Sequence, residues 1–63
     1  MTKTQQRDAT MARLACVQRM PDMAARILSA AHRAAMRASD KRELEALAQE
    51  LGVTGQRDWV ICG

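Results

Sequence analysis

The scarcity of large apolar side chains is the feature that most constrains how this chain folds. Its 63 residues include one Trp and no Phe or Tyr, while twelve of the apolar residues are Ala and five are Met. Burial of apolar area contributes about 25 cal/mol per Å², so Ala stabilises a core far less than Leu or Phe. The sequence therefore predicts one small domain of low stability, supported by self-association or by a bound partner.

Apolar residues at helical spacing predict an all-α fold, either a small three-helix bundle or a helical hairpin with a short C-terminal arm. We expect one domain, 1–63, with helices at about 3–19, 21–38 and 40–51 and an arm at 53–63. Thr2 and Gln5 fit a capping box at the first helix start, and Pro21 suits the start of the second. Asp40 is the expected cap of the third helix, and Gly52 its stop. The arm suits either a short helix or an extended segment.

The expected apolar faces of the first two helices differ in width. In the first helix, a narrow stripe contains Met11, Leu14, Ala15 and Gln18, with Val17 at its edge. The second helix has a continuous face formed by Met23, Ala24, Ile27, Leu28, Ala31, Ala34 and Ala35. Small side chains allow helix axes to approach closely. We therefore expect this second face to pack against another helix, either of the same chain or of a second copy, with Ala31 in the seam.

Charge is distributed unevenly along the chain. Residues 1–39 carry seven basic and two acidic side chains, whereas residues 40–63 carry three basic and five acidic ones, within a net charge of +3. This asymmetry suits an acidic partner for the first half or pairing between the halves, and it is also compatible with two solvated helix faces.

Two features are candidates for partner binding. Arg26, Arg33 and Arg37 fall within about 40° of one another on the second predicted helix, opposite its apolar face. Such a stripe would suit a larger protein with an acidic surface, or phosphates of a nucleic acid, or simple solvation. Trp59 is either the plug of a small core or an exposed anchor for a partner.

The residues that catalysis or metal binding needs are sparse. His32 has no acidic residue three or four positions away and is expected on the polar flank of its helix. Cys16, His32 and Cys62 are too isolated for a zinc site, and both cysteines are expected to be reduced and dispensable. The three glycines fit no phosphate-binding loop. We therefore expect no enzymatic activity, no metal and no cofactor.

Residues 43–54 include Ala48, Gly52 and Val53 at positions that resemble the first half of a DNA-binding helix-turn-helix. The resemblance covers about twenty residues and implies a small dimeric nucleic-acid-binding regulator. It is the alternative to our main expectation.

The main expectation is a small helical regulatory protein that binds a larger protein and inhibits or redirects it. The polar first residues fit no signal peptide, and no apolar run is long enough to span a membrane. A cytoplasmic location and a phage or plasmid origin, for example as an anti-defence inhibitor, are expected on these grounds and on size.

Overall fold

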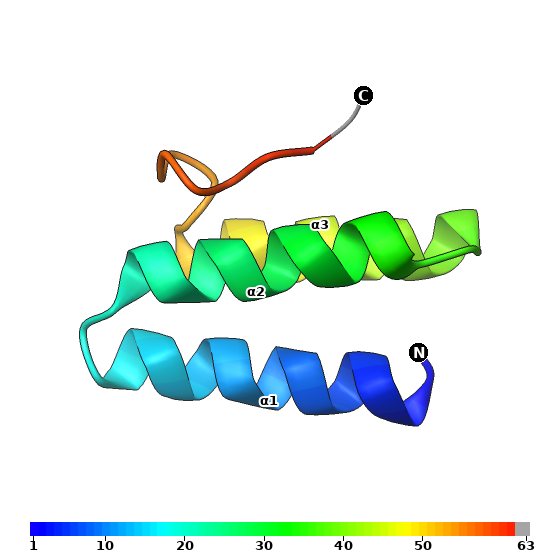
Figure 1. Ribbon diagram of the computed structural model, residues 1–63, viewed down its shortest axis with the longest axis horizontal. Helices are drawn as coiled ribbons and strands as arrows, with labels where there is room; N and C mark the ends of the chain where they lie inside the picture. The colour runs from blue at the N-terminus through cyan, green and yellow to red at the C-terminus, as the bar shows by residue number, and fades with distance from the viewer. Residues whose placement is uncertain (62–63) are drawn as a thin grey trace.

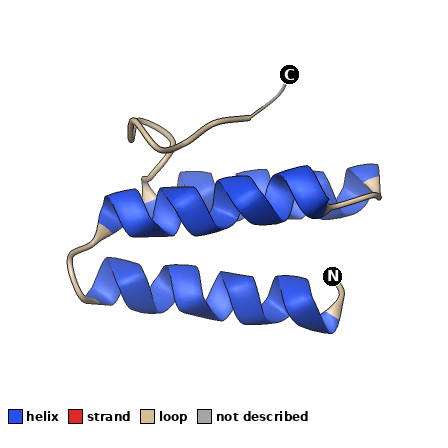
Figure 2. Cartoon of the chain, viewed as in Figure 1, coloured by secondary structure: helices blue, strands red, loops and turns tan. Residues whose placement is uncertain are grey.

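The computed structural model describes residues 1–61 and is a bundle of three helices (Figures 1 and 2). Helix α1 spans Lys3–Val17, α2 spans Pro21–Ala34 and α3 spans Ala38–Leu51. Helix α2 runs antiparallel to α1 and packs against both other helices (Figure 1). The predicted three-helix bundle is confirmed. Cys62 lies outside the described residues, whereas Cys16 is a partly buried free thiol beside the core.

The capping signals at α1 and at the α1–α2 turn act as predicted. The Thr2 hydroxyl accepts a hydrogen bond from the Gln5 amide at 3.2 Å, and the Gln5 side chain accepts one from the Thr2 amide at 2.8 Å. At the other end the amide of Met20 donates to the carbonyl of Ala15 at 2.8 Å. Arg19 has φ 60°, so a Schellman motif ends α1 with an arginine where glycine is usual. Pro21 then begins α2.

The boundary between α2 and α3 differs from the prediction. Helix α2 ends at Ala34 rather than near residue 38, because Ala35 takes extended backbone angles of φ −68° and ψ 133°. Helix α3 begins at Ala38, and its N-cap residue, Arg37, makes no side-chain capping bond. The expected cap, Asp40, lies instead within the first turn of α3, where the helix dipole favours a carboxylate. Neither Gly nor Pro marks this turn, so the sequence signals placed the end of α2 about four residues too late and the start of α3 about two residues too late.

Gly52 ends α3 as predicted. It has φ 71°, and its amide donates to the carbonyl of Gln49 at 3.1 Å. The next amide, of Val53, donates to the carbonyl of Ala48 at 3.1 Å, which completes a second Schellman motif. Both Val53 and Ala48 are fully buried, so the turn also carries the apolar contact that accompanies this motif.

Alanine supplies most of the core. The largest fully buried side chains are Leu28, Leu44 and Val53, and Leu47 is nearly so. The remaining buried apolar residues are all alanines, from the three helices and the residue that follows α2: Ala9, Ala12, Ala15, Ala24, Ala25, Ala31, Ala35 and Ala48. Because these side chains are small, the helix backbones can pack closely, and dispersion contacts between them replace part of what large side chains would supply.

The prediction for the buried face of α1 is right for Ala15 and wrong for the large apolar residues of the stripe. Met11 and Leu14 are about half exposed and Val17 is 78% exposed, whereas Ala9, Ala12 and Ala15 face inward. The buried face of α2 is itself lined by alanines, and small residues on both helices permit their close approach. The large apolar side chains of α1 are consequently left on its outer side.

The C-terminal arm, 53–61, is a series of turns followed by extended chain rather than a helix. The amide of Gln56 donates to the carbonyl of Val53 at 3.1 Å, and that of Trp59 to the carbonyl of Gln56 at 3.0 Å. The arm folds back along α2 (Figure 1). Within residues 1–61, no helix has the length and apolar character needed to cross a membrane.

Candidate partner-binding surface

The structure separates the three arginines that were predicted to form one stripe. Arg26 and Arg33 lie exposed on α2, but Arg37 lies beyond its end, at the start of α3. Arg26 also forms an ion pair with Asp58 of the arm, with 3.5 Å between Nη2 and Oδ2. Arg33 is therefore the member of the stripe that lies on α2 without an ion-pair partner within residues 1–61.

Trp59 is held on the molecule by its neighbours in the arm. The buried hydroxyl of Ser29 on α2 donates to the carbonyl of Asp58 at 3.1 Å and accepts from the amide of Val60 at 2.9 Å. These two bonds bracket Trp59, which is partly buried and packs against the core. This packing matches the core alternative for Trp59, although its indole is not fully enclosed.

The prediction for His32 is wrong. Instead of lying on a polar flank, His32 is buried, and its Nε2 is 3.1 Å from Oε2 of Glu45 on α3. A carboxylate only accepts hydrogen bonds, so the imidazole donates from Nε2. The prediction considered only acidic residues three or four positions from His32 on the same helix, whereas Glu45 lies on another helix. Ser29, one turn away, uses its hydroxyl to hold the arm rather than to contact His32.

Acidic and basic side chains are used differently in the fold. Five of the seven carboxylates lie within 3.7 Å of a cationic or imidazole nitrogen, including Asp40 and Glu43 beside the Met1 ammonium. Of the ten Lys and Arg side chains, only Arg13 and Arg26 form an ion pair within residues 1–61. Within residues 1–61, the charged side chains without an ion-pair partner are therefore mainly basic.

The predicted apolar face of α2 is divided between the core and the surface. Ala24, Leu28, Ala31 and Ala35 are buried within the chain, so a seam centred on Ala31 is used intramolecularly. Met23 is 40% exposed, Ala30 and Ala34 are exposed, and Ile27 is partly buried. These last four, spaced 4, 3 and 4 residues apart, fall within about 60° of one another on the outside of α2. With Met11 of α1 they form what we call the open face.

The open face lies on the side of the α1–α2 pair away from α3. On α2, His32 contacts α3 and lies about 140–180° around the helix from the open-face residues, whereas Ser29, which contacts the arm, lies about 100–160° from them. On α1, Met11 lies about 160° around the helix from Arg13, which pairs with Glu50 of α3 at 3.4 Å. Figure 1 shows α3 behind α2, with no helix in front of the α1–α2 pair.

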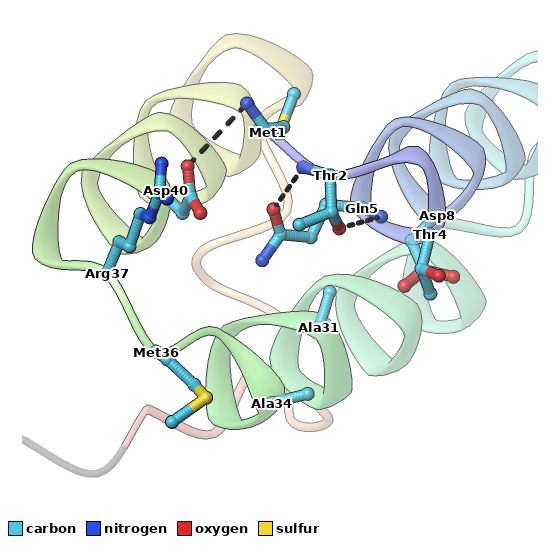
Figure 3. Close-up of a pocket in the computed structure, with 10 residues that line it drawn as sticks. All are labelled: Met1, Thr2, Thr4, Gln5, Asp8, Ala31, Ala34, Met36, Arg37 and Asp40. Atoms are coloured by element: carbon cyan, nitrogen blue, oxygen red, sulfur yellow. Dashed lines mark hydrogen bonds and ion pairs between the residues drawn. The ribbon is translucent and has the colours of Figure 1, made fainter.

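A pocket of about 470 Å³ lies at the end of the bundle where α1 begins and α2 ends (Figure 3). Ala31 and Ala34 of α2 face Thr4 and Asp8 of α1 across it. Its rim includes Met36, which is 96% exposed in the α2–α3 connection. Ala34 belongs to both the pocket and the open face, so the two form one continuous surface. No sequence signal indicated this pocket, because its residues come from all three helices.

The open face, the pocket and the exposed arginines suit binding of another molecule. Within residues 1–61, no group of three His, Cys, Asp or Glu side chains is placed to hold a metal ion. No helix follows Gly52 in the described chain, so the second helix that a helix-turn-helix requires is missing there. The bonds from Ser29 hold that segment against α2 instead. Comparisons with protein-family models, curated proteins and solved structures give no match to this chain.

Proposed function

We propose that this protein is a small regulatory protein. It binds an acidic surface of a larger protein and thereby inhibits or redirects that protein. The observation that carries the proposal is that arginines without an ion-pair partner in residues 1–61 lie beside exposed apolar side chains on α1 and α2. Exposed apolar surface rimmed by polar residues marks interaction sites in soluble proteins. Arginine is also enriched among the residues that dominate binding energy.

The charge distribution favours an acidic partner. Most carboxylates are engaged within the chain, whereas Arg7 and Arg33 lie exposed without an ion-pair partner in residues 1–61. Complementary charge raises association rates and discriminates among partners. We extend the proposal to a cytoplasmic location and to a role as a phage or plasmid accessory protein, in keeping with the size of the chain.

The experiment is affinity capture from the native host by the full chain, with nuclease treatment, followed by titration of the captured protein. Arg33→Glu should weaken binding by more than the 0–1 kcal/mol typical of an exposed ion pair, because an interface contact is partly desolvated. Arg42→Glu is the matched control, since Arg42 is also exposed but lies on α3. Circular dichroism should show both variants folded.

Two results would overturn the proposal. The first is capture that disappears with nuclease, together with an affinity that falls with salt at a log–log slope near −0.9 per phosphate contact, because this identifies a nucleic acid as the partner. The second is an equal effect of Arg33→Glu and Arg42→Glu on the captured protein. Such a result would show that the charge on α2 has no specific role.

A further inference from the structure

We propose that the open face binds an amphipathic helix of the partner, with an apolar stripe flanked on both sides by acidic residues. The inference rests on the proposed function and assigns both the site and the chemistry of its occupant. Three features of the molecule support it: the spacing of the exposed apolar residues, the charges on the two rims, and the pocket at one end.

The apolar spacing suits a helix. Successive apolar residues of the open face on α2 are 4, 3 and 4 positions apart: Met23, Ile27, Ala30 and Ala34. Packed helices interlock their side chains at this spacing. Ala30 and Ala34 leave room for a close backbone, while Met23 and Met11 supply flexible side chains that adapt to different partners. Helix α3 already covers the other side of the α1–α2 pair. A docked helix would therefore complete a four-helix arrangement around α1 and α2.

Both rims of the open face are basic. On α1, Arg7 lies one turn before Met11. On α2, Arg26 and Arg33 lie one turn before and just under one turn after Ala30. Arg26 already pairs with Asp58 of the arm, so Arg33 is the one of these two without an ion-pair partner in residues 1–61. An incoming helix with Glu or Asp on both flanks meets arginine on each side. A second copy of this chain would instead bring like-charged rims together, so charge complementarity selects an acidic helix over self-association.

The pocket lies at one end of the open face and therefore sets the orientation of the docked helix. Asp8 lies in the pocket without an ion-pair partner in residues 1–61. Arg37 lines the same pocket, also without an ion-pair partner in residues 1–61, so the two charges offset each other and the part of the incoming helix over the pocket should carry an apolar residue. Ala31, Ala34 and Met36 provide the apolar wall for such a side chain.

The test uses two capped synthetic helices of about 18 residues, long enough to be helical in solution. Both carry Leu at the core heptad positions, and the flanking positions are Glu in one and Lys in the other. Titration calorimetry with the full chain should show saturable binding of the Glu helix only. Ala30→Glu should weaken that binding about tenfold or more, because it places a carboxylate in the middle of the apolar row.

The matched control is Ala46→Glu, the same change at an exposed alanine of α3, which should leave the affinity unchanged. Equal binding of both peptides, or equal effects of the two substitutions, would overturn the inference. So would a dimer in sedimentation that Ala30→Glu dissociates, since the occupant would then be a second copy. A partner captured from the host equally well by wild type and Ala30→Glu would overturn this site and leave the proposed function standing. Failure to capture any protein would overturn the proposed function itself.

Discussion

At the scale of single residues, two positions have a positive φ, and only one of them lowers the stability of the fold. Arg19 and Gly52 both close Schellman motifs, at φ 60° and φ 71°. The left-handed conformation costs a residue with a Cβ atom about 1–2 kcal/mol, whereas glycine adopts it freely. The backbone is therefore strained at the C-terminal end of α1 and unstrained at the C-terminal end of α3.

Arg19→Gly should raise the free energy of unfolding by about 0.5–1 kcal/mol, since relief of strain exceeds the extra chain entropy of glycine in the unfolded state. Gly52→Ala should lower it by about 1 kcal/mol. A Cβ atom at Gly52 meets no atom within 4 Å, so its cost is purely conformational. Urea denaturation followed by circular dichroism measures both. A loss of stability in Arg19→Gly would contradict the assignment of strain at that residue.

Ser29 is the second residue whose role a substitution can isolate. Ser29→Ala removes two bonds at once and leaves the Val60 amide and the Asp58 carbonyl without their partner. We expect a loss of about 1–3 kcal/mol and a red-shifted Trp59 fluorescence, because the arm loosens and the indole becomes wetter. Ser39→Ala, at an exposed serine in the first turn of α3, should change neither quantity. Unchanged fluorescence in Ser29→Ala would show that the arm is held by packing alone.

At the scale of elements, the sequence predicts helix ends well wherever a specific residue imposes them. Thr2 with Gln5, Pro21 and Gly52 each act through local geometry, and each end is found as expected. The α2–α3 turn has no such residue, so tertiary packing sets its position. The face of α1 was mispredicted for a related reason: periodicity treats large apolar residues as buried, but the buried apolar residues of α1 are all alanines.

The register of α1 can be tested by two substitutions on opposite sides. Ala12→Leu should cost about 1–3 kcal/mol, because Ala12 is fully buried and the added atoms overpack the helix contact. Leu14→Gln should stay within about 0.5 kcal/mol, since half of that side chain is already in water. Chemical denaturation gives both values. The reverse order of effects would mean that α1 buries the stripe of Met11 and Leu14 after all.

At the scale of the whole molecule, pairing between distant segments decides which groups face outward. Nothing in the sequence links His32 to Glu45, Arg26 to Asp58 or Ser29 to the arm, because these partners lie 13 to 32 positions apart. The basic character of α1 and α2 was predictable from composition. The open face was not, because it depends on which side of the α1–α2 pair α3 occupies.

Binding of the partner through the open face is tested most directly by NMR of the full chain labelled at methionine methyl groups, titrated with the nuclease-treated captured partner. Met11 and Met23 should shift and broaden, while the indole signal of Trp59, on the arm side of α2, stays in place. A shift of the Trp59 indole with Met11 and Met23 unmoved would contradict the claim and place binding on the C-terminal arm.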